Sequence, residues 1–254
     1  MMTLAQLMTA DAEAAAQRYG LLVEGWRSLY FAALDQSHFG TEKQIVEVTS
    51  RAYSIARMYL NAETDRIQAD TIQYAQEAQR VTLEQLSSKQ TFELAGPADE
   101  HLNANNDYLL REIEVQIERD IAFLRLSLRS IYLHVTMASR ANGLPLRAAL
   151  MQYRIGNAAD LNFVFRDRRN QRWPSQKFIR SVWRHHLLSV YNETVLITLS
   201  DHGVDTAQIS HSDQKSPHHG TLLSIDSNSE LPTYAELKPT VFHPNSEATL
   251  GMVA

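Results

Sequence analysis

The sequence of 254 residues contains no cysteine. This absence excludes disulfide bonds, thiolate zinc sites and a cysteine nucleophile, and it fits a reducing environment. Glycine is also scarce, with nine residues in total and no Gly-x-Gly pattern. Kinase phosphate loops and dinucleotide-binding loops depend on such glycines, so neither class of enzyme is expected.

Long apolar runs are missing as well. The most apolar region, residues 109–137, is interrupted by several charges, among them Arg111, Glu118 and Arg125, so it is not expected to cross a bilayer. The first residues lack the basic start and the unbroken apolar core of a secretory signal. With 44% hydrophobic and 21% charged residues, the composition is that of a globular protein that does not enter a membrane.

The net charge of −5 is small, but the charges are unevenly distributed along the chain. Residues 1–120 contain 19 acidic and 10 basic side chains, whereas residues 140–190 contain 2 acidic and 10 basic ones. Uneven charge says more about partners than the total does. The acidic first half and the basic middle are therefore both candidates for contacts with charged partners.

Helical periodicity dominates residues 1–140. Apolar residues recur at three and four positions over Thr9–Asp35, and a capping-box pattern at Thr41 predicts a second helix that ends near Leu60. The next stretch, Asn61–Lys89, is helix-like but has few apolar residues. A helix that is polar over most of its surface is solvated or lies along a partner, so we expect a protruding or partner-facing hairpin arm here.

The strongest periodic pattern follows a break predicted between residues 95 and 106. It consists of Leu110, Ile113, Ile117, Ile121, Leu124, Leu128, Ile131 and Val135. Such a stripe is typical both of a coiled-coil seam and of the central helix of a bundle, and a single chain does not distinguish the two. Gly143 and Pro145 then predict a helix end and a new helix start.

The second half predicts one further long helix and a small β-containing region. A basic turn closes on Trp173-Pro174, and proline is suited to the first helical turn that follows. Residues 175–200 are predicted to form an amphipathic helix that Gly203 ends, with a buried stripe of Phe178, Val182, Leu187, Val190, Thr194 and Ile197. Residues 204–210 and 221–225 have the pattern of short strands.

Together these patterns predict a mainly α protein with a small C-terminal α+β module. Long helices are expected in the N-terminal half, and a few short antiparallel strands are expected after residue 203. We expect a long-helix region at 1–140, which is a possible attachment region for a partner, and the module at 141–254.

The late histidines are the first candidates for chemistry. Five of the ten histidines follow residue 200, and His211, His219 and His243 are the weak candidates for metal ligands. No His-Glu-x-x-His spacing is present, and the alternative is a polar turn in which histidines form hydrogen bonds. Serines lie near these histidines, but none is in a Gly-x-Ser-x-Gly elbow. The sequence therefore predicts no enzyme and no cofactor, with a metal-dependent enzyme or toxin-like effector as the alternative.

A basic and aromatic cluster is the second candidate. Its members are Arg166, Arg168, Arg169, Arg172, Trp173, Lys177, Arg180, Trp183 and Arg184. Arginine and aromatic residues at this density suit phosphate contacts or a protein interface. The alternative is a helix face whose arginines pair with the acidic N-terminal half. Between a nucleic-acid interface and a protein interface, the protein interface is favoured, because the whole chain is acidic and would be repelled by a duplex.

The order of motifs over the last 90 or so residues resembles a known family. A polar turn ending in Arg172-Trp173, an aliphatic-Ser-His step at 209–211, Gly220 followed by Thr-Leu-Leu-Ser-Ile, Leu231-Pro-Thr-Tyr and a terminal Phe242-His-Pro-Asn occur in sequence. This ordered set resembles the Mu F-like minor head proteins of tailed bacteriophages. The chain departs from the family at Ser246, where relatives commonly have cysteine, so the resemblance implies no cysteine-based metal knuckle here.

The resemblance implies a structural virion protein involved in phage head assembly. Its partners would be the portal protein and other head proteins, in multiple copies in a ring or around the portal, and packaged DNA is a further candidate. The expected location is the virion head near the portal, and the host cytoplasm during assembly. A nucleic-acid-binding packaging factor is a second alternative function.

Overall fold

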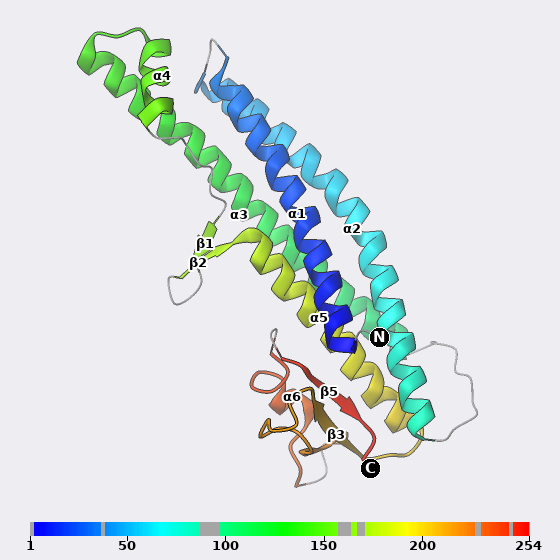
Figure 1. Cartoon of the computed structure of the whole chain (residues 1–254). Coiled ribbons are helices and arrows are strands. Elements are labelled where there is room, and N and C mark those ends of the chain that lie inside the picture. Colours follow the sequence, from blue (N-terminus) through cyan, green and yellow to red (C-terminus); the bar gives the residue numbers. More distant parts are fainter. Residues whose placement is uncertain are drawn as a thin grey trace. The chain divides into compact units, whose positions relative to one another are not determined.

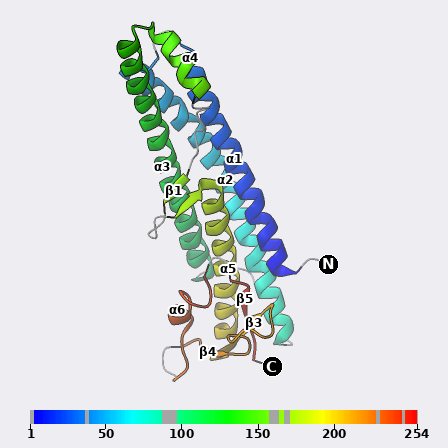
Figure 2. The ribbon, with the colours of Figure 1, turned by 60° about the vertical axis from the view of Figure 1, so that its left-hand side comes forward.

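A computed structural model describes residues 3–36, 39–86, 97–156, 164–166, 171–226, 230–243 and 246–253. In chain order the elements are α1 (Leu4–Leu34), α2 (Glu42–Gln85), α3 (Pro97–Asn142), α4 (Leu146–Gly156), β1 (Val164–Arg166), β2 (Arg172–Pro174), α5 (Ser175–Asp201), β3 (Thr206–His211), β4 (Leu222–Ser224), α6 (Tyr234–Leu237) and β5 (Ala248–Gly251). Figures 1 and 2 show them from two directions. The structure is 74% helical, which confirms the predicted fold class. None of the helices in the described ranges is both long and apolar enough to span a membrane.

The chain divides into two compact units. Unit 1 consists of residues 1–15, 63–112 and 179–254, and unit 2 consists of residues 16–62 and 113–178. Each unit combines segments from both sides of residue 140. The division into regions 1–140 and 141–254 therefore stays a prediction.

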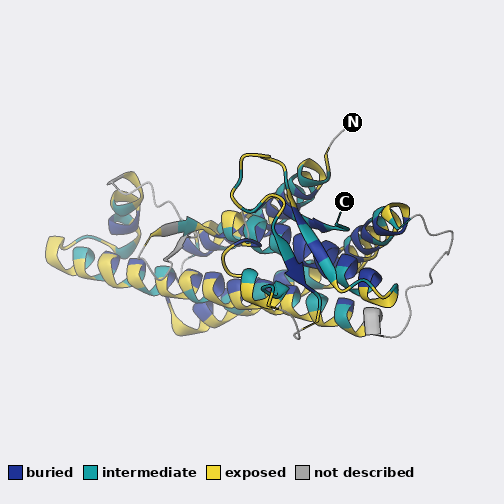
Figure 3. Ribbon diagram, turned by 90° about the horizontal axis from the view of Figure 1, so that it is seen from below, coloured by how far each residue is buried: buried dark blue, intermediate teal, exposed yellow. Residues whose placement is uncertain are grey.

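The core of unit 2 is built from three helices. The indole Nε1 of Trp26 in α1 donates to the carbonyl oxygen of Ala52 in α2 at 3.1 Å. The third helix, α3, contributes a stripe of buried residues at the predicted spacing: Ile113, Ile117, Ile121, Leu124, Leu128, Ile131 and Val135. These residues make α3 a core helix of a bundle. Figure 3 colours the residues by burial, and both buried, dark-blue and exposed, yellow residues are seen along the long helices.

The connection from α1 to α2 is fixed by a glycine and a glutamine. The φ angle of Gly40 is +75°, a conformation that glycine adopts without a side-chain clash. Its amide donates to Gln44 Oε1 at 2.6 Å, and Gln44 Nε2 donates to the carbonyl oxygen of Ala33 at 2.7 Å. Thr41 Oγ1 accepts from the Gln44 amide at 3.3 Å, as the capping-box pattern predicts.

The expectation of a separate hairpin arm at 61–89 is wrong for residues 61–86, and residues 87–89 lie outside the described residues. Residues 42–85 form one helix, because no proline or glycine interrupts the chain near Leu60. The second half of α2 also has a buried face within unit 1, and polar residues form part of it: Glu63, Ile67, Thr71, Tyr74, Ala75, Ala78, Thr82 and Leu83. Because buried polar groups look like solvent-facing ones in a sequence, the sequence pattern alone predicts an exposed helix.

The break predicted between residues 95 and 106 extends too far. Helix α3 already begins at Pro97, and proline is favoured at the first helical position. Asn105 and Asn106 lie inside the helix, where their side chains bond to Glu193 and Thr71. These tertiary contacts outweigh the low helix propensity of asparagine.

The predicted stop after α3 is confirmed. Gly143 has a φ of +65°, α3 ends at Asn142 and α4 begins after Pro145. Next along the chain, β1 and β2 form a short antiparallel hairpin that pairs Phe165 with Trp173. Helix α5 follows immediately at Ser175.

The helix α5 occupies the interior of unit 1 and is not amphipathic. Every residue from His186 to Val195 is buried. The predicted stripe is correct for Leu187, Val190 and Thr194, but Phe178, Val182 and Ile197 are only half-buried. The helix ends as predicted at Gly203, whose φ is +71°. Packing on several sides of α5 explains why one stripe does not describe it.

A three-stranded antiparallel sheet in the order β4-β3-β5 completes unit 1. The strands β3 and β4 lie where the sequence predicts them, whereas the sequence pattern does not predict β5. The side chain of Asn192 in α5 accepts from the Leu250 amide at 2.9 Å and donates to the Ala248 carbonyl at 3.4 Å. Because these groups lie on the edge of β5 that faces away from β3, Asn192 pairs that edge much as a neighbouring strand would.

Candidate functional site

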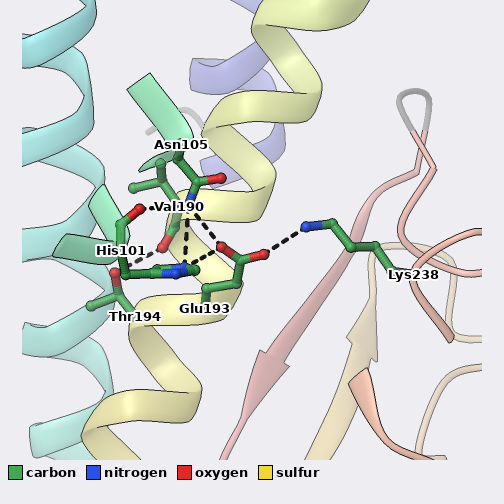
Figure 4. A network of polar contacts seen from close by, with 6 residues as sticks. All are labelled: His101, Asn105, Val190, Glu193, Thr194 and Lys238. Atoms are coloured by element: carbon green, nitrogen blue, oxygen red, sulfur yellow. Dashed lines mark hydrogen bonds and ion pairs between the residues drawn. The ribbon is translucent and has the colours of Figure 1, made fainter. Parts of the chain in front are cut away.

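A buried carboxylate lies at the centre of a polar network in unit 1. Glu193 of α5 accepts a hydrogen bond from Lys238 Nζ at 2.6 Å and one from Asn105 Nδ2 at 2.8 Å, and His101 Nε2 also contacts Glu193 Oε2. Figure 4 shows the carboxylate between Lys238 on one side and His101 and Asn105 of α3 on the other. The network therefore connects α3, α5 and the segment after α6.

The electrostatics of the network favour the ionised carboxylate. Burial by itself raises the pKa of Glu193, but the hydrogen bonds from His101, Lys238 and Asn105 outweigh it and lower the pKa to about 2. Glu193 is therefore ionised throughout the neutral range. Both of its oxygens are occupied by donors, so the network acts as an internal crosslink.

Sequence reasoning missed this network, although one signal was present. Asn192 and Glu193 are polar residues in the middle of the apolar run of α5. A charge in a buried helix requires partners, because an unpaired buried carboxylate is very costly. The partner positions 101, 105 and 238 do not follow from any local spacing.

A second series of buried hydrogen bonds in unit 1 includes His186. Its Nε2 lies 2.8 Å from Thr71 Oγ1, and that hydroxyl donates to Asn106 Oδ1 at 2.6 Å. Because the hydroxyl proton is used for Asn106, His186 Nε2 carries the hydrogen that Thr71 accepts. Burial lowers the pKa of His186 to about 4, so the ring is neutral at pH 7.

The structure contradicts the expected interface for two buried members of the basic cluster, Trp183 and Arg184, and a third member forms an ion pair within unit 1. Trp183 is buried, and its Nε1 donates to Asp70 Oδ2 at 3.2 Å. Arg184 is also buried and donates to the Ser246 carbonyl at 2.8 Å. Arg180 forms an ion pair with Glu13 at 2.7 Å. The contacts of these side chains connect distant segments of unit 1. The ion pair of Arg180 agrees with the alternative prediction that the arginines of this helix pair with the acidic N-terminal half.

The remaining members of the cluster belong to unit 2. Lys177 is exposed and its Nζ lies 4.6 Å from the centre of the Trp173 ring, a cation–π distance. Arg166 and Arg172 pair through their backbones in the β1–β2 hairpin. Arg168 and Arg169 lie outside the described residues.

Two of the three candidate metal ligands lie close together but form hydrogen bonds. His219 Nδ1 accepts from the His211 amide at 3.1 Å, and His211 Nδ1 accepts from the Asp213 amide at 3.0 Å. His243 is exposed. Across the ranges that the structure describes, no group of three His, Asp or Glu side chains could hold a metal ion. The loop geometry agrees with the polar-turn alternative.

Charge is strongly segregated between the two units. Unit 2 has 16 Lys and Arg against 9 Asp and Glu, a net charge of +7, whereas unit 1 has 8 against 20, a net charge of −12. The net charge of the chain hides this difference. A partner that contacts unit 2 meets a basic surface.

A groove of about 640 Å³ runs between α2 and α3 in unit 2. It is lined by Glu42, Ile45, Val46, Thr49, Ser50, Tyr53, Ser54, Arg57, Arg125 and Arg129. Three arginines therefore face one glutamate. Arg129 pairs with Glu42 at 2.5 Å, and Tyr53 donates to Glu118 at 2.6 Å.

An exposed apolar stripe lies on α3 of the same unit. Leu126, Leu133 and Met137 are 58%, 60% and 70% exposed, and Phe123 lies one turn earlier. Their spacing of three, seven and four residues places them along one face of the helix. Contiguous exposed apolar side chains of this kind are characteristic of interaction surfaces.

Comparisons with protein-family models, with curated proteins and with solved structures find no match to this chain.

Proposed function

We propose that this chain is a structural protein of phage head assembly, a minor head protein that associates with the portal. The observation that carries the proposal is the exposed stripe of Phe123, Leu126, Leu133 and Met137 on α3. A helix that buries one face in a bundle and exposes a second apolar face is suited to bind a protein surface. The order of motifs from residue 165 to residue 245 then points to the Mu F-like proteins.

The interior of unit 1 is consistent with this role. Its buried polar groups, Glu193, Arg184 and His186, contact other residues of the same chain. Such networks fix the positions of segments that are far apart in the sequence. A component that serves as a scaffold for other proteins requires this kind of rigidity.

Co-expression with the portal protein from the same genome tests the proposal. We expect the two proteins to co-elute in size-exclusion chromatography, and light scattering then gives the number of copies in the complex. The double variant Leu126→Asp/Leu133→Asp should lose the complex, because it places charges in the stripe. Leu21→Asp/Met58→Asp is a matched control, since both residues are exposed apolar residues elsewhere on unit 2.

A wild-type chain that elutes free of the portal protein at micromolar concentration would contradict the proposal. Loss of the complex in both double variants would instead assign the effect to general damage and not to the stripe. Circular dichroism of each variant checks that the helices are retained.

The charge of unit 2 favours binding of packaged DNA as a second candidate function. A basic surface attracts phosphates, and the affinity then falls steeply with salt. Replacement of Arg168, Arg169 and Arg172 by alanine should lower both the affinity for duplex DNA and its salt dependence. Affinity that is the same in wild type and triple variant would exclude this basic turn as the DNA contact.

A further inference from the structure

We infer that the groove between α2 and α3 in unit 2 binds an acidic amphipathic α-helix of a partner protein. This inference rests on the proposed function, because it assumes that the partner is a protein. The inference specifies where on unit 2 the partner protein binds and which kind of segment of the partner is bound.

The shape of the groove suits a helix. Its α2 wall is formed along one face by Val46, Ser50, Tyr53 and Arg57, which recur every three or four residues. The twelve residues from Val46 to Arg57 are separated by eleven steps of 1.5 Å, so they extend over about 16 Å. A partner helix of about three turns matches this length. The small side chains Ser50 and Ser54 allow its backbone to come close.

The charges of the groove require an acidic occupant. Arg129 is already paired with Glu42. Arg57 and Arg125 also line the groove, and neither has an ion-pair partner among the residues that the structure describes. Carboxylates on both edges of a bound helix would supply these partners, since oppositely charged groups across an interface give specificity and fast association.

The apolar part of the groove favours a protein helix over a nucleic acid. Val46 is 60% exposed and Tyr53 is 40% exposed, and both line the groove. Aliphatic side chains at i, i+3, i+4 and i+7 of a bound helix would cover them. A phosphate backbone would leave Val46 without an apolar partner.

The first experiment measures binding of a synthetic peptide to the full chain. The probe is a helical peptide of about 18 residues with Leu and Ala on one face and Glu on the flanks, labelled for fluorescence anisotropy. The same peptide with Lys in place of Glu is the charge control. We expect the Glu peptide to bind and the Lys peptide not to bind.

Two variants locate the peptide. Arg57→Glu/Arg125→Glu should weaken binding by about tenfold or more, because it places like charges against the peptide. Arg51→Glu/Arg140→Glu changes the net charge equally on the same two helices, but neither residue lines the groove. We expect the affinity of this control variant to stay within about threefold of wild type, since only long-range attraction changes.

Three results would overturn the inference. They are equal weakening in both double variants, no binding of the Glu peptide at about 100 μM, and binding of a short DNA duplex in place of the peptide with the same dependence on Arg57 and Arg125. The last result would make the groove a nucleic-acid site.

Binding of wild type and variants to the portal protein shows whether the proposed function, the inference or both fail. If wild type does not bind the portal protein, the proposed function fails, whatever the peptide does. If wild type binds it and Arg57→Glu/Arg125→Glu binds it equally well, the function stands and the groove is not the contact. Loss of the complex in this variant, with retention in Arg51→Glu/Arg140→Glu, supports both.

Discussion

Replacement of Glu193 by glutamine should destabilise unit 1 by about 3 to 4 kcal/mol at pH 7. The lowering of the pKa of Glu193 from 4.5 to about 2 corresponds to about 2.5 pH units, and each unit is worth about 1.4 kcal/mol. The carboxylate is buried, so solvent screening reduces this value little. Glutamine has one acceptor oxygen and one amide group, so it must turn a donor toward Lys238 or toward His101 and Asn105.

The pH dependence gives a sharper test than the value at one pH. Because the pKa is lower in the folded than in the unfolded state, the stabilisation is complete above pH 4.5 and is lost as the pH falls through 2. The difference in unfolding free energy between wild type and Glu193→Gln should therefore be constant from pH 7 to about pH 5 and should shrink below it. Urea unfolding followed by circular dichroism at several pH values measures this difference.

A matched control is available on α2. Glu84 forms an exposed ion pair with Arg80, so Glu84→Gln should change stability by no more than about 0.5 kcal/mol. The reasoning would be refuted by a difference below about 1 kcal/mol for Glu193→Gln at pH 7. A difference that increases as the pH falls would refute it as well.

The remaining predictions concern unit 2. Gly40→Ala should lower the free energy of unfolding by more than about 2 kcal/mol, because a Cβ atom would lie 2.1 Å from the Tyr132 ring at a φ of +75°. Gly143→Ala should lower it by only about 1 kcal/mol, because Gly143 has a φ of +65° but open space around it. Equal shifts of the melting temperature in the two variants would contradict this. For Asp120, burial raises the pKa to about 6, against the lowering by its hydrogen bonds from Tyr19 and other donors. The stabilising contribution of Asp120 is therefore complete below pH 3.8 and is lost as the pH rises through 6. Asp120→Asn should flatten the pH profile of stability between pH 4 and 7. An unchanged profile would contradict the raised pKa of Asp120.

The helices could be predicted from the sequence because their rules are local. The stripe from Ile113 to Val135 follows the helical period, and Gly143 and Gly203 mark helix ends through a backbone conformation that glycine favours. The sequence predicts the bounds of α5 correctly, but it does not predict that α5 is buried on several sides. A buried arginine such as Arg184 looks like a surface residue until its partners are known.

The polar networks and β5 could not be predicted because they depend on distant segments. Glu193 bonds to residues 88 and 45 positions away. The strand β5 has the sequence Ala-Thr-Leu-Gly, which has little β-propensity of its own. It becomes a strand because β3 and Asn192 occupy its two edges.

The interleaved composition of the two units has a consequence for synthesis on the ribosome. Unit 2 has all its segments once Phe178 has emerged, whereas unit 1 also needs residues 179–254. The first segment of the chain, residues 1–15, therefore waits for α5 before Glu13 can pair with Arg180. A chain that stops before Ala248 leaves one edge of β3 without its neighbour, and an open strand edge is a template for association with other chains. Nascent and truncated chains should therefore be the species that aggregate.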